Sequence, residues 1–194
     1  MLEALITSKT RIKLLLKFFL NPVSEGYLRG LSTEFGESTN AIRLELNHLE
    51  EAGILESESS GHKKMFHANQ QHPLYNDIQS IIHKYVGMDK IIEKVVNHLG
   101  EPQDVYLIGD LAKGHDSKEL HILIIGENID QEYLDQLCHK AQKLISRKIF
   151  AELMTTQDFQ EQKDELLKKP LLKVWTRSNE NTYLRSYEGK HVTT

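Results

Sequence analysis

Hydrophobic positions in the first third of the chain recur with the period of an α-helix. Four of them lie at positions i, i+3, i+4 and i+7, which share one face of a helix: Ile12, Leu15, Leu16 and Phe19. This spacing predicts a helix over residues 9–20, which Ser8 can cap at its N-terminus. The same pattern predicts two more helices, over about residues 25–35 and 38–52, each of which a glycine would close.

A short hairpin and a longer helical segment follow these three helices. The stretches ILESES and KKMFHAN flank SGH, and two short strands around a glycine predict a β-hairpin. Residues 74–99 then carry a helical pattern, which predicts one helix or two, with Gly87 as the point of a break. The first hundred residues are therefore predicted to be mainly helical.

Strand and helix patterns alternate in the second half of the chain. Strands are predicted over residues 104–108, 119–125 and 149–154, and helices over residues 131–147 and 156–168. The segment after Pro170 is predicted to be a mixed tail. This alternation is typical of a small α/β sheet. The fold class is therefore a two-domain α+β or α/β protein, with domains over residues 1–72 and 101–194 and a helical linker over residues 73–100.

Composition and charge exclude several classes of protein. The chain has 194 residues and a formal net charge of -4, so its surface as a whole is not built to bind nucleic acid. Its single cysteine, Cys138, excludes an internal disulfide and a CxxC site. Charged residues interrupt the apolar N-terminus, which is therefore neither a signal peptide nor a membrane span. We expect a soluble cytoplasmic protein with no membrane partner.

The first half resembles winged helix-turn-helix regulators of the bacterial arsenic-repressor-like type. The resemblance covers about residues 5–70 and lies in the stretches SKTRIKLLLKFFLNP, YLRGLSTEFGES and NAIRLELNHLEEAGIL, with SGHKKMFHAN at the place of the wing. It implies that the third helix is a recognition helix and that the partner is double-stranded DNA. Because such proteins bind two half-sites as dimers, it also implies a homodimer.

Two groups of residues are the candidates for DNA contacts. If the apolar stripe of the third helix faces the core, the opposite face carries Asn40, Arg43, Leu44 and Asn47. Asparagine can pair with adenine, arginine with guanine, and a leucine can touch a thymine methyl. The wing offers His62, Lys63 and Lys64 for phosphates.

The charge balance of the first half supports an alternative interpretation. Residues 1–72 contain 8 Lys and Arg against 9 Asp and Glu, a balance of -1. DNA affinity depends largely on the neutralisation of phosphates, which this balance does not favour. Two other interpretations therefore stay open: the same fold could serve as a protein-interaction module, or the whole chain could be an assembly protein that does not bind DNA.

The stretch YLIGDLAKGHDSKELHILII resembles part of the nucleotidyltransferase domain of the DNA polymerase beta superfamily, and the resemblance extends over about residues 90–170. The family has Gly-Ser after its first strand, then Ala-Arg-Gly, then Asp-x-Asp at the start of the next strand. Six residues at or beside these positions are the candidates for ligand binding: Gly109, Asp110, Lys113, Gly114, Glu119 and His121.

The residues at these positions depart from the chemistry of the family. Two carboxylates at i and i+2 of a strand can hold the Mg²⁺ ions of phosphoryl transfer, but His121 is a poor ligand for Mg²⁺. Asp110 places an anion beside a phosphate, and two unit charges about 4 Å apart repel by roughly 4 kcal/mol at an effective dielectric near 20.

We therefore predict no catalytic residue, metal site or cofactor. We expect a degenerate domain used for dimerisation or for sensing a nucleotide or small-molecule ligand. An active transferase of a toxin–antitoxin type, which would use Glu119 with Asp110 or Asp116 and a different metal, is the alternative. A dimer seam is expected on the 74–99 segment, through Ile78, Ile81, Ile82 and Tyr85.

Overall fold

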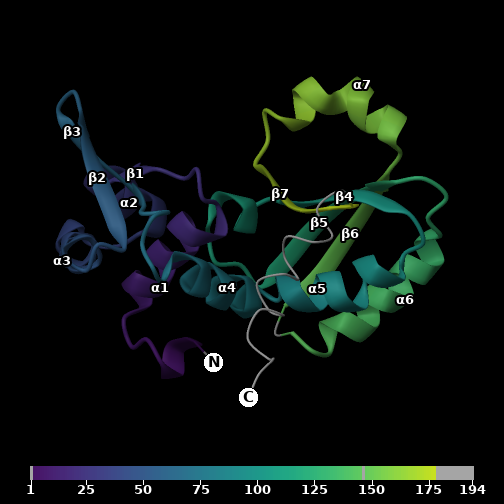
Figure 1. The fold of residues 1–194 in the computed structure, drawn as a ribbon, viewed down its shortest axis with the longest axis horizontal. Helices are drawn as coiled ribbons and strands as arrows, with labels where there is room; N and C mark the ends of the chain where they lie inside the picture. Colours follow the sequence, from purple (N-terminus) through teal and green to yellow (C-terminus); the bar gives the residue numbers. More distant parts are fainter. Residues whose placement is uncertain (1, 146, 178–194) are drawn as a thin grey trace, which may run out of the picture. The chain divides into compact units, whose positions relative to one another are not determined.

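Two compact units make up the chain. The computed structural model describes residues 2–145 and 147–177, which form a mixed α+β fold with two β-sheets (Figure 1). Unit 1 contains the described residues up to Asp89 together with Asp110–Lys118. Unit 2 contains Lys90–Gly109 and the described residues from Glu119 onward. Unit 1 thus extends past residue 72, and the predicted domain boundaries, which concern independent folding, stay a prediction.

Serine caps begin two of the helices of unit 1. The Oγ of Ser8 accepts a hydrogen bond from a backbone N–H of the first turn of α1 (Lys9–Leu15), at 3.2 Å. A π-helical segment, η2 (Leu16–Leu20), continues from α1. Ser38 caps α3 (Thr39–Glu51) in the same way, at 3.1 Å. The first and third predicted helices are therefore confirmed.

The second helix begins later than predicted because the residues before it form a strand. This strand, β1 (Gly26–Tyr27), precedes α2 (Leu28–Phe35). The predicted hairpin is confirmed as β2 (Leu55–Ser60) and β3 (Lys63–Ala68). Strand β3 pairs with both of the others, so the antiparallel sheet has the order β1-β3-β2. Three helices followed by this hairpin give unit 1 the arrangement of a winged helix, and the hairpin is its wing.

Helix α4 (Tyr75–Val86) belongs to the core of unit 1. The rings of Tyr75 and Phe19 lie 5.5 Å apart, which places the start of α4 against η2. The side chain of Ile82 is only 1% exposed. The predicted seam is therefore wrong for Ile82, because this side chain packs inside unit 1. Gly87, with φ +92°, ends α4 as predicted, and α5 (Met88–Lys94) follows.

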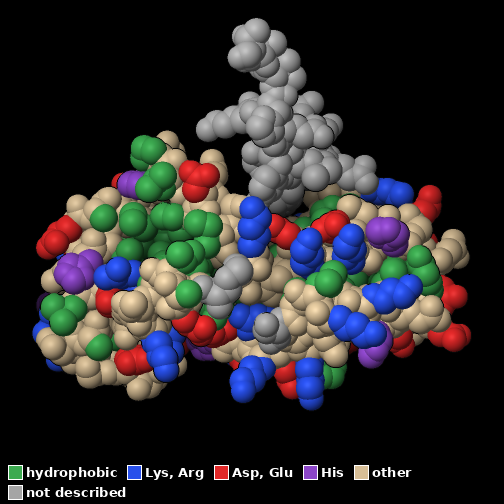
Figure 2. All heavy atoms as spheres, turned by 90° about the horizontal axis from the view of Figure 1, so that it is seen from below, with side chains coloured by type: hydrophobic (Ala, Val, Ile, Leu, Met, Phe, Trp, Pro, Cys, Tyr) green, Lys and Arg blue, Asp and Glu red, His purple; other side chains and the backbone are tan. Residues whose placement is uncertain are grey.

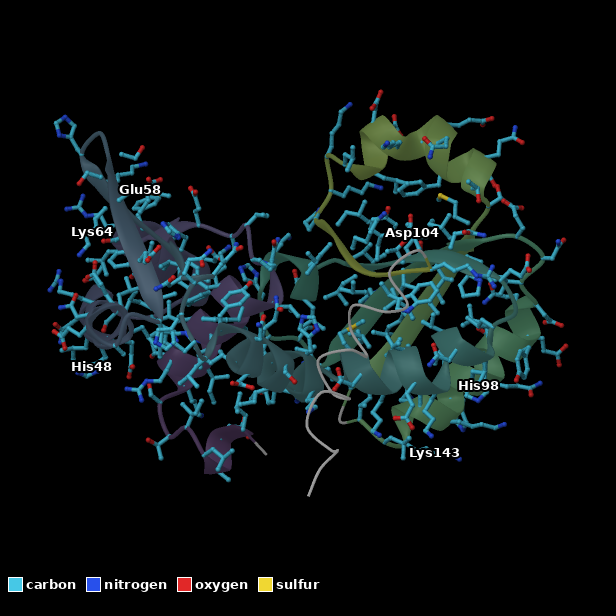
Figure 3. All side chains as sticks on the ribbon, in the orientation of Figure 1. His48, Glu58, Lys64, His98, Asp104 and Lys143 are labelled. Carbon is cyan, nitrogen blue, oxygen red and sulfur yellow. The ribbon has the colours of Figure 1, made fainter. Side chains whose placement is uncertain are left out.

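Unit 2 is built on a four-stranded sheet. Its strands have the order β6-β5-β4-β7 and are β4 (Pro102–Ile108), β5 (Glu119–Gly126), β6 (Lys148–Met154) and β7 (Leu171–Thr176). Strand β4 is antiparallel to β5 and β7, whereas β5 is parallel to β6, to which α6 (Gln131–Gln142) connects it. Strand β7 lies in the segment predicted only as a mixed tail, where no strand was specified; the rest of that tail, residues 178–194, lies outside the described residues. An ion pair of 3.0 Å between Lys173 and Asp104 ties β7 to β4; Figure 3 labels Asp104.

Helices cover both faces of this sheet. Figure 1 shows α6 on one face and α7 (Thr156–Leu166) on the other. A buried cluster of Tyr106, Leu123 and Ile125 packs against Phe159 of α7. Because alternate residues of a strand share a face, Glu119 and His121 lie on the same side of β5 as this cluster. Both of these side chains are partly or fully exposed, beyond the cluster.

The surface of unit 1 carries apolar side chains outside its core. On the face drawn in Figure 2, hydrophobic side chains gather over the left half, where unit 1 lies, and charged side chains of both signs are interspersed over unit 2. The large hydrophobic side chains of unit 1 that are exposed are Leu5, Val23, Leu44, Leu74 and Ile81. Among the described residues, no helix has both the length and the apolar character that a membrane span requires.

Candidate nucleic-acid interface

Helix α3 turns its predicted contact residues to the solvent. The inner stripe is buried, with Ile42, Leu46 and Leu49 no more than 5% exposed. The opposite face carries the four predicted side chains, all exposed: Asn40, Arg43, Leu44 and Asn47. Leu44 is 53% exposed, so a binding partner could reach its side chain. The orientation of the helix follows the prediction, and the DNA contacts themselves stay a prediction.

A groove of about 620 Å³ lies between α2, α3 and the wing. Basic side chains line it from all three elements: Arg29, Arg43, His62, Lys63 and Lys64. Its apolar lining comes from Tyr27, Leu28, Leu46 and Phe66. No aspartate or glutamate of the described chain lines this groove. The groove therefore concentrates positive charge although residues 1–72 have a negative balance.

Arg29 is a residue of this groove that sequence reasoning missed. It lies in the first turn of α2, next to Leu28, and its side chain is exposed. The start of α2 also contributes positive potential, because the N-terminus of a helix carries a partial positive charge. A basic residue just after a helix start was the available signal, but its position beside α3 and the wing depends on tertiary packing.

The two neighbouring lysines of the wing have different surroundings. Lys64, which Figure 3 labels on the wing, forms an ion pair with Glu50 of α3, with 2.7 Å between Nζ and Oε2. Glu50 also accepts a hydrogen bond from Ser57, and the hydrogen bonds from Lys64 and Ser57 hold the pKa of this carboxyl below its usual value. Lys64 thus ties the wing to α3 and has its charge largely neutralised.

Lys63 contacts an aromatic ring rather than a carboxylate. Its Nζ lies 4.2 Å from the centre of the Tyr27 ring. Within the part of the chain that the structure describes, Lys63, Arg29 and Arg43 form no ion pair with a carboxylate. Three of the cations that line the groove are therefore free to meet an anionic partner.

Two other carboxylates of unit 1 are paired with basic residues that do not line the groove. Arg11 of α1 forms an ion pair of 2.7 Å with Glu45 of α3. Burial raises the pKa of Glu45, but hydrogen bonds from Ser8 and Arg11 outweigh this effect and lower it. Lys13 pairs with Glu37, also at 2.7 Å. Contacts of Arg11 or Lys13 with a phosphate would therefore require these pairs to break.

The glycine loop of the nucleotidyltransferase resemblance is divided between the two units. Asp110, Lys113 and Gly114 belong to unit 1, whereas Gly109, Glu119 and His121 belong to unit 2. The loop contains a short 3-10 helix, η4 (Leu111–Lys113). The structure therefore places the six predicted ligand residues in two different packing environments.

In unit 1 this loop packs on η2 and α2. A Cβ atom on Gly114, whose φ is +81°, would stand 2.5 Å from the Cα of Lys17. The Nζ of Lys17 donates a hydrogen bond of 3.3 Å to the carbonyl of Lys113. The side chain of His115 bonds to Glu34 of α2 and packs edge-on against Phe35. Gly114 thus serves close packing of the loop rather than an approach to phosphate.

A small pocket of about 270 Å³ lies beside this loop in unit 1. Asp110 and Gly114 line it together with Lys13, Glu34, Phe35, His115 and Asp116, and Lys13 is already paired with Glu37. Three carboxylates at one pocket disfavour a phosphate by charge repulsion. Lys113 does not line the pocket, and its Nζ lies 3.7 Å from a carboxylate oxygen of Asp110. The carboxylates at this pocket therefore do not favour an anionic ligand, and the ligand contacts of these residues stay a prediction.

In unit 2 the side chains at the Asp-x-Asp positions bond to each other. The Nε2 of His121 lies 3.1 Å from Oε2 of Glu119. The His121 ring stacks on Phe150 of β6, with ring centres 4.7 Å apart and planes at 14°. Nowhere in the described residues do three His, Cys, Asp or Glu side chains form a group able to hold a metal ion.

Comparisons with known proteins add little to this geometry. No protein-family model matches the chain, and neither does any curated protein. One solved structure with some similarity is that of the transcriptional regulator BldR from Sulfolobus solfataricus. The match has 13% sequence identity and a TM-score of 0.35, and it covers 50% of this chain and 70% of BldR. The function proposed below therefore rests on the geometry of the site.

Proposed function

We propose that this protein is a DNA-binding transcription regulator whose winged-helix unit contacts double-stranded DNA. One observation carries the proposal: the groove between α2, α3 and the wing is lined by basic side chains and by no carboxylate. Non-specific DNA binding depends on such a local concentration of charge and not on the net charge of the chain. Arg43 and Asn47 of α3 would read base edges, and Arg29 and Lys63 would contact phosphates.

The distribution of ion pairs supports the same surface. Two carboxylates of unit 1 pair with basic residues outside the groove, in Arg11–Glu45 and Lys13–Glu37, whereas Glu50 pairs with Lys64 of the groove. These pairs remove negative charge that would otherwise repel a phosphate backbone. The balance of -1 over residues 1–72 is thus compatible with a basic groove, because the groove lining contains basic side chains and no described carboxylate.

A titration of labelled duplexes with single-site variants tests the proposal. We expect salt-sensitive binding, which Arg43→Ala weakens by about 1–3 kcal/mol together with a loss of sequence preference. Lys63→Ala should weaken binding to all sequences alike, and Lys64→Ala should have a smaller effect because Glu50 already neutralises this lysine. Lys168→Ala, an exposed charge change in unit 2, is the matched control.

Two outcomes would contradict the proposal. One is the absence of binding to mixed-sequence and promoter duplexes at low salt. The other is binding that Arg29→Ala, Arg43→Ala and Lys63→Ala leave unchanged. In either case the groove would be a site for an acidic protein partner, as the alternative of an interaction module requires.

For unit 2 we propose a noncatalytic, nucleotidyltransferase-like unit that serves dimerisation or ligand sensing. The stacking of His121 on Phe150 and its bond to Glu119 support this role, because both side chains at the metal positions bond to protein groups. The three carboxylates beside the glycine loop support it as well. No step of phosphoryl transfer is assigned to this chain.

A further inference from the structure

Tyr27 connects the start of α2 to the wing. In the pairing of β1 with β3, Tyr27 lies opposite Met65, so Lys63 is its diagonal neighbour on the same face. Long side chains reach one another across such diagonal positions of an antiparallel pair. The Lys63 Nζ lies 4.2 Å from the centre of the Tyr27 ring, within the range of a cation–π interaction.

Gly30 makes room for the same ring. A Cβ atom at Gly30 would stand 2.8 Å from Cε1 of Tyr27, a distance that real side chains do not adopt. Gly30 lies inside α2, where alanine would normally favour the helix more than glycine does. Its φ is not in the left-handed region, so the backbone conformation does not require glycine here. The glycine is therefore explained by the space that the Tyr27 ring occupies.

An aromatic ring and a carboxylate can both restrain a lysine side chain, but they differ in how much of its charge remains available. Glu50 holds Lys64 and neutralises its charge at the same time. The Tyr27 ring restrains Lys63 but leaves the full positive charge of the ammonium group. Because a free lysine has many rotamers, restraint before binding lowers the entropy that is lost when the side chain meets its ligand.

We propose that Tyr27 is a positioning residue that holds the Lys63 ammonium at the groove for a phosphate of duplex DNA, and that Gly30 leaves the space for its ring. This inference rests on the proposed function and adds a residue to it. Tyr27 need not touch DNA itself, since its effect passes through Lys63. The pair would act on all sequences alike, because a phosphate contact carries no base information.

The test measures fluorescence anisotropy of a labelled mixed-sequence duplex with the full chain over a series of potassium chloride concentrations. We expect Tyr27→Leu to weaken binding by roughly threefold to tenfold and to lower the slope of log affinity against log salt by up to about 0.9, as the loss of one phosphate contact would. Tyr27→Phe, which keeps the ring, should bind like the unaltered protein.

Two further variants separate positioning from a general loss of structure. Tyr27→Leu combined with Lys63→Ala should bind no more weakly than Lys63→Ala alone, because the two changes remove the same contact. Gly30→Ala should shift the ring and lower the salt slope as Tyr27→Leu does, while the thermal unfolding midpoint stays close to that of the unaltered protein. A merely structural role of Tyr27 would instead add to the effect of Lys63→Ala.

The outcomes distinguish this inference from the proposed function. If the unaltered protein does not bind the duplex at low salt, both fail together. If Arg43→Ala weakens binding but Tyr27→Leu and Gly30→Ala leave affinity and salt slope unchanged, only the positioning role is overturned. The same holds if Lys63→Ala binds normally, or if the effects of Tyr27→Leu and Lys63→Ala add up.

Discussion

At the scale of single residues, a buried histidine controls how unit 1 responds to acid. His83 of α4 is 8% exposed, and burial lowers the pKa of its imidazole from 6.5 to about 4. The folded protein therefore keeps this side chain neutral in a pH range where the unfolded chain binds a proton. Stability from this group is fully present above pH 6.5 and is lost progressively as the pH falls toward 4.

We expect the free energy of unfolding to fall by roughly 3 kcal/mol between these pH values because of His83 alone. Glutamine at this position has no proton to gain, so His83→Gln should show a shallower loss of stability toward acid. Urea unfolding at several pH values on both sides of 6.5 measures the difference. Carboxyl groups also titrate in this range. Their contribution is the same in both proteins, so it cancels when His83→Gln is compared with the unaltered protein.

His62→Gln is the control for this experiment. His62 lies at the turn of the wing and is exposed, so this variant removes one histidine without disturbing a buried side chain. Equal slopes for the unaltered protein and His83→Gln would contradict the account of His83.

At the scale of elements, the glycine loop shows how one segment can be held by packing. Gly114 and Gly109 have similar backbone angles, with φ of +81° and +74°. A side chain at either position costs about 1–2 kcal/mol because of the left-handed conformation. Only at Gly114 would a Cβ atom also meet backbone, that of Lys17, whereas nothing lies within 4 Å of a Cβ at Gly109.

Gly114→Ala should therefore destabilise the protein clearly more than Gly109→Ala. The additional cost arises because the loop must move away from η2 and weaken the hydrogen bond between Lys17 and the carbonyl of Lys113. Thermal or urea unfolding of the two variants provides a matched comparison. Equal destabilisation would mean that the packing of the loop on unit 1 adds nothing to stability.

Most elements of this fold could be predicted because their signals are local. Helices α1 and α3 follow from serine caps and from apolar residues at helical spacing, and the wing follows from two short strands around Gly61. Strand β7 was missed because a short apolar run after Pro170 does not reveal whether it joins a sheet. Its assignment depends on pairing with β4, which lies far away in sequence.

The candidate site was predictable to the extent that it lies on one helix face. The stripe of Ile42, Leu46 and Leu49 determines which side chains of α3 point outward. No local signal indicated that Glu50 would neutralise Lys64, and the basic residue near the start of the second helix did not by itself show that Arg29 would line the groove. Those features depend on how α2 and the wing pack against α3, which periodicity does not report.

At the scale of the whole molecule, the structure changes how the predicted dimer can be tested. Periodicity identified an apolar stripe on α4 but not what covers it. Ile82 is covered by the core of unit 1, whereas Ile81 is 47% exposed and remains a candidate for a contact with a second copy. A fragment of residues 1–72 would lose the packing of Tyr75 and Ile82, so its weaker DNA binding would not by itself demonstrate the loss of a dimer.

A substitution in the full chain avoids this difficulty. We expect the protein to be a dimer in light scattering, and we expect Ile81→Glu to shift it toward the monomer without a large loss of stability, because exposed positions tolerate charge. Ile82→Ala, the matched neighbour, should instead destabilise the fold by about 2–5 kcal/mol, because it leaves a cavity in a packed core.

A dimer joined through Ile81 brings the second winged helix to an effective concentration in about the mM range, provided that both half-sites can be reached. Ile81→Glu should therefore weaken binding to a duplex with two half-sites much more than binding to a duplex with one. If the unaltered chain is monomeric, the mechanism of paired half-sites fails, and DNA binding would depend on a single groove.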